Sequence, residues 1–151
     1  WGKSEIIPAQ EHLISNLIKQ KLFASIDGLP TESKPKKKHL LFLPPGEDHE
    51  IGLLLTYYLL KQAGHQIYYL GSNVPLGNIE MSIQLSNPDS LMFFAVRSWT
   101  LEKLQAVVDE ISKIYKGVIY VFGSHAVIKD VKGDNLNKIS SLEDFKKTTF
   151  V

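Results

Sequence analysis

The chain has 151 residues, of which 44% are hydrophobic and 22% are charged, and its formal net charge is +1. This length and composition fit one globular domain with a modest appendage. The small net charge gives the whole chain no general attraction to nucleic acid, and no apolar run reaches the length of a membrane span. The absence of cysteine excludes disulfides, thiolate metal sites and a cysteine nucleophile. With no secretory signal visible, we expect a cytoplasmic protein without membrane contact.

Residues 1–27 form the first segment, and a helix is predicted from its apolar spacing. Pro8 suits a first helical turn and Gly28 is a natural stop. The apolar face comprises Leu13, Ile14, Leu17, Ile18, Leu22, Phe23 and Ile26. Such a wide stripe must pack on something, so we expect one helix of an incomplete bundle. The chain begins at Trp1 without methionine, which suggests a fragment of a longer protein.

Residues 28–38 are interpreted as an exposed, mobile linker, because this stretch contains two prolines, one glycine and four lysines. Residues 39–151 then alternate between strand and helix patterns. The predicted strands cover 40–43, 66–70, 91–96 and 118–122, with a fifth near 139, and the predicted helices cover 49–63, 76–85, 100–115, 126–131 and 141–147. This alternation indicates right-handed βαβ units. The predicted class is therefore α/β, a Rossmann-like (flavodoxin-like) doubly wound parallel sheet of about five strands.

The loops at the carboxyl edge of such a sheet are the usual ligand-binding positions of open α/β folds. The loop after the first predicted strand reads Pro44-Pro45-Gly46-Glu47-Asp48-His49. It lacks the Gly-x-Gly-x-x-Gly of a dinucleotide site, and the chain has no Walker-type loop and no Gly-x-Ser-x-Gly. A phosphoacceptor domain would need an aspartate after the third strand, where the chain has Ala95-Val96-Arg97-Ser98.

After these exclusions, one kind of site remains for this edge, namely metal binding by a histidine side chain. Imidazole binds metal through one nitrogen, and a carboxylate on the other nitrogen fixes the tautomer. Glu47 or Asp48 could supply that carboxylate to His49, and Gly52 would let a bulky group approach the helix one turn later. The alternative is a solvated or capping histidine at a helix start. The other histidines of this region, namely His39, His65 and His125, are interpreted as solvent-facing or loop residues.

The stretch Glu47-x-His49-x-x-Gly52 on this loop resembles the cobalamin-binding signature Asp/Glu-x-His-x-x-Gly. The resemblance implies that His49 displaces dimethylbenzimidazole and becomes the lower axial ligand of cobalt. It also implies that the displaced nucleotide tail enters a slot beside the sheet. The implied cofactor is adenosylcobalamin or methylcobalamin.

Trp1 and Glu11-His12 resemble the Trp…Glu-His pattern of the cobalamin-dependent, light-sensing transcription regulators of the MerR type. The resemblance implies that Trp1 covers the upper corrin face, with Glu11 and His12 on the same side. It implies that His12 can reach cobalt after photolysis. It also implies a non-enzymatic sensor that forms a homo-oligomer and contacts DNA only through an N-terminal domain absent from this chain.

Two regions depart from this family pattern. The family's Ser-x-Leu after the third strand is replaced by Phe93-Phe94-Ala95-Val96-Arg97-Ser98, so two phenylalanines would narrow the tail slot. The family's Gly-Gly after the fourth strand is Gly123-Ser124. We expect Val96, Gly123 and Ser124 to line this altered slot. Two alternatives stay open: a corrinoid carrier module of a methyltransferase or mutase system, and a domain that has lost the cofactor and serves oligomerisation.

Overall fold

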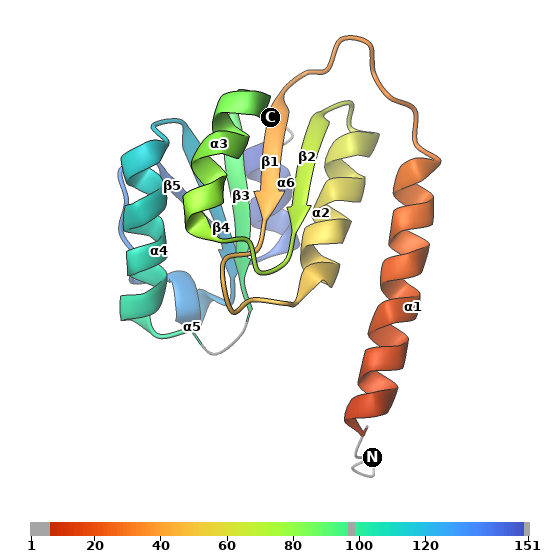
Figure 1. Ribbon diagram of the computed structural model, residues 1–151, viewed down its shortest axis with the longest axis horizontal. Helices are drawn as coiled ribbons and strands as arrows, with labels where there is room; N and C mark the ends of the chain where they lie inside the picture. The colour runs from red at the N-terminus through yellow and green to blue at the C-terminus, as the bar shows by residue number, and fades with distance from the viewer. Residues whose placement is uncertain (1–6, 97–98, 150–151) are drawn as a thin grey trace.

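The structure is a computed structural model that describes residues 7–96 and 99–149, and it places one long helix beside an α/β domain (Figure 1). The elements run in the order α1 (Pro8–Asp27), β1 (Lys38–Phe42), α2 (Glu50–Gln62), β2 (Gln66–Gly71), α3 (Leu76–Ser86), β3 (Ser90–Ala95), α4 (Leu101–Ile114), β4 (Val118–Gly123), α5 (His125–Ile128), β5 (Leu136–Ile139) and α6 (Leu142–Thr149). The predicted strands and long helices are confirmed. The predicted helix over 126–131 is shorter and begins one residue earlier, as α5.

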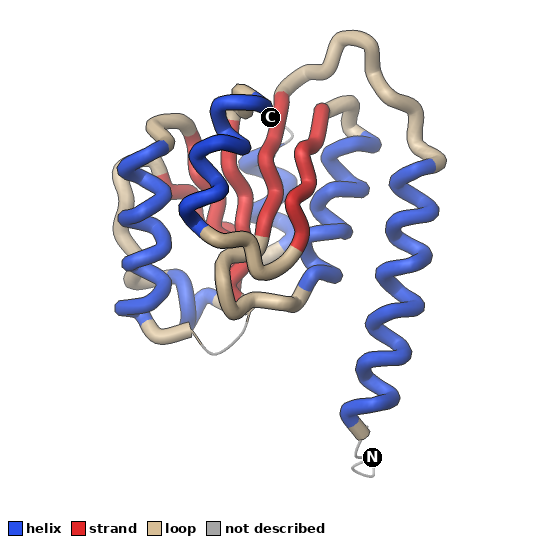
Figure 2. The backbone as a smooth tube through the Cα atoms, viewed as in Figure 1, coloured by secondary structure: helices blue, strands red, loops and turns tan. Residues whose placement is uncertain are grey.

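The sheet has the strand order β2-β1-β3-β4-β5, and all of its strand pairs are parallel. Helices cover both faces (Figure 2). Because side chains alternate along a strand, Leu40 and Phe42 of β1 pack toward α3 and α4, whereas Leu41 packs toward α2 and α6. The central strands β1 and β3 are buried on both sides, which explains their nearly continuous apolar runs. The α/β prediction is therefore confirmed.

The N-terminal helix α1 lies along α2 and leaves most of its apolar face uncovered. Lys19 Nζ lies 3.4 Å from Glu50 Oε2, and Lys61 Nζ donates to the carbonyl oxygen of Ile26 at 2.8 Å. The rings of Phe23 and Tyr69 meet edge to face, with centroids 6.0 Å apart. The exposed apolar side chains of α1 are Leu13, Ile14, Leu17, Ile18 and Phe23. The interpretation of α1 as one helix of a bundle stays a prediction.

Within the described ranges, no helix combines the length and the apolar character that a bilayer crossing requires.

Two histidines at the amino-terminal edge of the sheet are buried. The interpretation of His39 as a solvent-facing or loop residue is wrong, because His39 lies in β1. His65 is a loop residue, as expected, but its side chain does not face solvent. His39 Nδ1 lies 2.7 Å from Ser90 Oγ, and His39 Nε2 lies 3.1 Å from His65 Nδ1. His39 occupies an inward-facing position of β1, on the same face as Leu41. Burial, followed by the neighbouring His65, lowers the pKa of His39 to about 4. Burial also lowers the pKa of His65.

Candidate functional site

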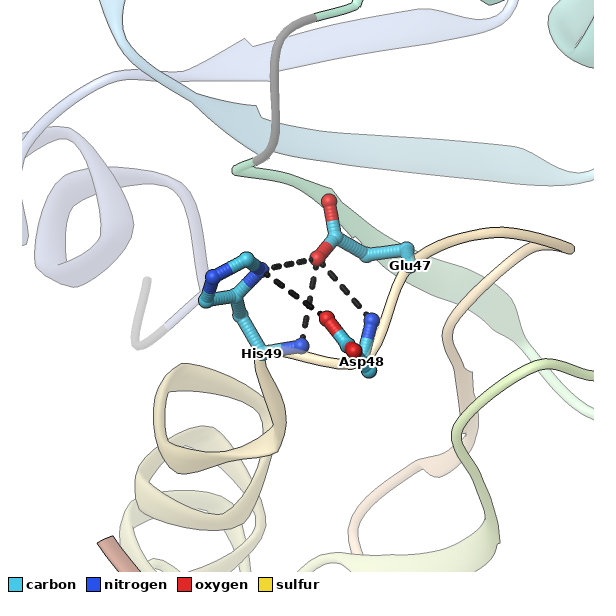
Figure 3. A group of neighbouring side chains, drawn as sticks. All are labelled: Glu47, Asp48 and His49. Atoms are coloured by element: carbon cyan, nitrogen blue, oxygen red, sulfur yellow. Dashed lines mark hydrogen bonds and ion pairs between the residues drawn. The ribbon is translucent and has the colours of Figure 1, made fainter. Parts of the chain in front are cut away.

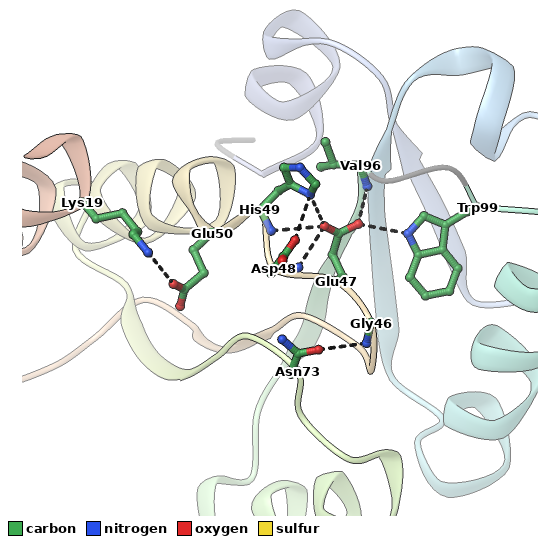
Figure 4. A network of polar contacts seen from close by, with 9 residues as sticks. All are labelled: Lys19, Gly46, Glu47, Asp48, His49, Glu50, Asn73, Val96 and Trp99. Atoms are coloured by element: carbon green, nitrogen blue, oxygen red, sulfur yellow. Dashed lines mark hydrogen bonds and ion pairs between the residues drawn. The ribbon is translucent and has the colours of Figure 1, made fainter. Parts of the chain in front are cut away.

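The loop after β1 and the loop after β2 are tied together at the carboxyl edge of the sheet. Gly46 has φ +84°, a left-handed conformation that glycine adopts without strain. Its N–H donates to Asn73 Oδ1 at 2.9 Å (Figure 4). The N–H of Val74 donates to the carbonyl oxygen of Leu43 at 2.9 Å. These contacts fix the course of the chain that carries the next three residues.

Glu47 is a fully buried carboxylate that joins this loop to the end of β3. Its Oε1 accepts from the backbone N–H groups of Asp48 and His49, each at 3.1 Å, and lies 2.5 Å from His49 Nδ1. Its Oε2 accepts from the backbone N–H of Val96 at 2.9 Å and from the indole Nε1–H of Trp99 at 3.0 Å (Figure 4). Hydrogen bonds from N–H donors favour the ionised form of a carboxylate.

His49 is the residue before α2, and its side chain is 47% exposed. Sequence reasoning left Glu47 and Asp48 open as its partner. In the structure Glu47 Oε1 lies at 2.5 Å from Nδ1, whereas Asp48 Oδ1 lies at 3.5 Å. An ionised carboxylate only accepts, so Nδ1 of His49 donates and the lone pair is left on Nε2. Figure 3 shows that Nε2 faces away from Glu47. This arrangement suits a metal ligand.

A cavity of about 920 Å³ lies between α1 and the start of α2, and we call it the large cavity. It is lined by Glu11, His12, Ser15, Asn16, Lys19, Asp48, His49, Glu50, Ile51, Gly52, Ser72, Phe94 and Val96. Five of the predicted cofactor-binding residues therefore line one space, although they come from three separate segments: Glu11, His12, His49, Gly52 and Val96. Trp1 lies outside the described residues.

A second cavity, of about 390 Å³, adjoins the first, and we call it the small cavity. It is lined by Gly52, Leu55, Thr56, Leu59, Phe94, Val96, Phe122, Gly123, Ser124, Ile139, Ser140, Ser141, Leu142 and Phe145. The two cavities share Gly52, Phe94 and Val96. Gly123 and Ser124 line only the small cavity, where Val96 joins them.

The floor of the small cavity is aromatic. The rings of Phe94 and Phe122 stack with centroids 4.4 Å apart and planes 7° apart. A Cβ added to Gly52 would lie 2.7 Å from Cε1 of Phe94, so the absent side chain at Gly52 makes room for this ring. Gly123 is also confined, because a Cβ there would lie 2.9 Å from the carbonyl oxygen of Ala95.

Trp99 is a site residue that sequence reasoning missed. It follows the third strand, at the expected ligand-binding edge, and its ring packs partly buried against the core. Its partner Glu47 lies 52 positions away in the chain. Tryptophan at that edge was the available signal, but pattern reasoning cannot pair two residues so far apart.

The fold and this edge together define a class of protein. The sequence model of the B12 binding domain matches residues 40–132, and the chain belongs to this family. Among curated proteins, it is 33% identical over 103 residues to the HTH-type transcriptional repressor CarA of Myxococcus xanthus, covering 68% of this chain and 35% of CarA. It is 27% identical over 106 residues to the HTH-type transcriptional repressor CarH of the same organism, covering 70% of this chain and 34% of CarH. The chain thus spans about a third of each repressor's length.

Solved structures share the fold at lower identity. The Methanosarcina barkeri monomethylamine corrinoid protein superposes with a TM-score of 0.72 at 18% identity, covering 95% of this chain and 71% of that protein. The methanol:cobalamin methyltransferase complex MtaBC of the same organism superposes with a TM-score of 0.61 at 19% identity, covering 94% of this chain and 55% of that one. A cobalamin-binding protein from Desulfitobacterium hafniense superposes with a TM-score of 0.58 at 19% identity, covering 77% of this chain and 59% of that protein. These likenesses confirm the Rossmann-like fold.

Proposed function

We propose that this chain is the sensor part of a transcriptional regulator, and that His49 is the lower axial ligand of cobalt in a bound adenosyl- or methylcobalamin. The observation that carries the proposal is the His49–Glu47 pair: a buried carboxylate holds Nδ1, and Nε2 faces away from it. Family membership supports the corrinoid. The similarity to CarA and CarH supports the regulatory role and a DNA contact made by other parts of the full-length protein.

The residues of the site fit a corrinoid on its lower side. A metal-binding imidazole must keep one lone pair available, and the Glu47 contact leaves that lone pair on Nε2. The large cavity offers about 920 Å³ beside His49, and the small cavity continues from it. We propose that the nucleotide tail enters the small cavity against the Phe94–Phe122 pair. When bound, the cobalamin would supply a carbon–cobalt bond that light can break.

The contribution of α1 is to close the large cavity from the side opposite His49. Glu11 and His12 line it from this helix, and His12 is the residue that we propose approaches cobalt once the upper ligand is lost. The described side-chain contacts of α1 include the Lys19–Glu50 pair and the edge-to-face contact of Phe23 with Tyr69. The Lys19–Glu50 pair is only partly exposed, but ion pairs near the surface contribute little, and we propose that a ligand can control the position of this helix.

We propose that the chain divides into a bundle helix (1–27), a linker (28–38) and the cobalamin domain (39–151). Sensing requires two arrangements of the first and third parts that differ in their affinity for the ligand. The exposed apolar face of α1 would be covered by other bundle helices in a homo-oligomer of the full-length protein. Ligand and light would then act on assembly, and through assembly on DNA binding.

Reconstitution in the dark tests the proposal. The protein is mixed with adenosylcobalamin, desalted, and its visible spectrum is recorded before and after illumination. We expect retained colour with the base-off, histidine-bound spectrum, and its loss in His49→Ala. His125→Ala is the matched control, because His125 is exposed near the same sheet edge and lines neither cavity.

Two further outcomes are informative. If colour washes out of the wild-type protein, the chain does not bind this corrinoid, and a role in oligomerisation alone remains. If colour is retained but light leaves the oligomer size unchanged in gel filtration, the result favours a corrinoid carrier over a light sensor.

A further inference from the structure

We propose that Trp99 is a positioning residue for His49. Its indole N–H holds the Glu47 carboxylate in the orientation that fixes the His49 ring with Nε2 available. This inference rests on the proposed function, in which His49 is the cobalt ligand. It assigns a role to a side chain that lines neither cavity.

The two oxygens of Glu47 have separate sets of partners. Oε1 is bonded within its own loop, to the backbone of Asp48 and His49 and to the His49 ring. Oε2 is bonded to the far end of β3, through the backbone of Val96, and to Trp99. The contacts on Oε2 therefore set the rotation of the carboxylate, and the rotation sets where Oε1 meets His49 Nδ1.

The polarity of these contacts matters as much as their positions. A backbone N–H and an indole N–H can donate but cannot accept. Oε2 must therefore remain an acceptor for Val96 and Trp99. With Oε1 also accepting from two backbone N–H groups, the consistent role for His49 Nδ1 is that of a donor, which leaves the lone pair on Nε2.

The position of Trp99 in the fold makes it a stiff support. Its ring packs against the core shared by β3 and α4, and Thr100, the next residue, caps α4 by accepting from the N–H of Lys103 at 3.3 Å. Glu47 itself is fully buried, so water does not replace a lost donor easily. Removing the indole N–H takes away one of the donors on Oε2 and leaves the Val96 N–H there, so the carboxylate, and with it the ring of His49, is held less firmly.

The variant Trp99→Phe removes the N–H and keeps an aromatic ring. Tyr115→Phe is the matched control, because it removes one buried hydrogen bond, from Tyr115 Oη to the carbonyl oxygen of Pro88 at 2.9 Å, at the opposite edge of the sheet. Two properties are measured at one neutral pH. The first is the ¹⁵N shift of each His49 ring nitrogen in protein without corrinoid, assigned with His49→Gln. The second is the dissociation constant for diaquocobinamide, a corrinoid without a nucleotide tail.

In the wild-type protein we expect Nδ1 to be protonated and Nε2 to be unprotonated. In Trp99→Phe we expect the two nitrogen shifts to move toward each other, because a fraction of the His49 rings loses its Glu47 contact, and cobinamide binding to weaken about tenfold, the lower end of the range for residues that support a metal ligand. Tyr115→Phe should leave both properties at wild-type values. An unchanged tautomer and an unchanged dissociation constant in Trp99→Phe would overturn the proposal.

A measurement on the wild-type protein keeps the inference testable if Trp99→Phe does not fold. The chain has two tryptophans, so the indole proton of Trp99 is readily assigned. We expect this proton to exchange slowly with solvent, and to exchange faster in Glu47→Gln. Exchange at the rate of a free indole would contradict the proposal. If the wild-type protein fails to bind cobinamide, the proposed function fails, whereas the tautomer and exchange measurements still decide the role of Trp99.

Discussion

The histidines at the two edges of the sheet have opposite environments. At the carboxyl edge, His49 shares one nitrogen with a buried carboxylate and stays half exposed beside the large cavity. At the amino edge, His39 and His65 are buried against each other, with Ser90 Oγ as the partner of the other His39 nitrogen. A carboxylate that only accepts leaves a ring with one lone pair available for a ligand, whereas mutual burial produces a neutral pair that serves stability.

Removing the Glu47 carboxylate at the carboxyl edge is expected to have the largest effect on stability. Glu47→Ala leaves the Val96 and Trp99 donors unpaired in a buried site, and at 1–3 kcal/mol for each donor we expect the free energy of unfolding to fall by about 4 kcal/mol. Urea unfolding measures it. Asp48→Ala, at a side chain that is 58% exposed, is the neighbouring control and should cost less than about 1 kcal/mol. Equal losses in the two variants would contradict the network described for Glu47.

The amino edge predicts a pH dependence. The pKa of His39 falls from 6.5 to about 4 on folding, so between these values the unfolded chain binds a proton that the native chain does not. Stability is therefore complete above pH 6.5 and declines as the pH falls toward 4, by about 3 kcal/mol for His39 alone. The lowered pKa of His65 acts in the same direction.

Urea unfolding at several pH values between 7 and 4.5 measures this slope. His39→Gln should flatten it, whereas His125→Gln, at an exposed histidine, should leave it unchanged. If the unfolding free energy of His39→Gln still falls with pH as in the wild-type protein, a group other than His39 causes the pH dependence.

A smaller loss of stability is expected from adding a side chain at Gly52, beside the small cavity. Gly52→Ala forces a Cβ to 2.7 Å from the Phe94 ring, and overpacking of this kind costs about 2 kcal/mol. The cost should disappear in a Phe94→Ala background, which a double-mutant cycle of unfolding free energies tests. Gly77→Ala is the matched control: nothing lies within 4 Å of a Cβ there, so alanine in this helix should stabilise by about 0.5 kcal/mol. If Gly52→Ala costs the same in both backgrounds, Phe94 is not what confines Gly52.

The smallest expected effect concerns α1. Lys19→Met removes the partly exposed pair with Glu50, and we expect a loss of about 0.5 kcal/mol in thermal or urea unfolding. Lys21→Met is the control on the same helix. A loss above 2 kcal/mol would mean that this pair anchors the helix and that its position is not open to control.

Local rules were sufficient for most of the fold. The predicted helices over 100–115 and 141–147 begin at Thr100 and Ser141, and in the structure the side-chain oxygens of these residues accept from the N–H groups of Lys103 and Asp144. The site was predicted where its residues are neighbours in the chain, as with Glu47 and His49. Contacts between distant segments were not predictable: His39 of β1 meets Ser90 of β3 and His65 in the loop before β2, and Trp99 contacts Glu47 from another loop.

The most direct test of the central claim is the electron paramagnetic resonance spectrum of cob(II)alamin in protein labelled with ¹⁵N-histidine. If His49 is the lower axial ligand, the nitrogen superhyperfine pattern changes from a triplet in unlabelled protein to a doublet in labelled protein, and His49→Ala abolishes the doublet. A triplet that persists in the labelled protein would mean that the cofactor's own base still binds cobalt, and it would contradict the role assigned to His49.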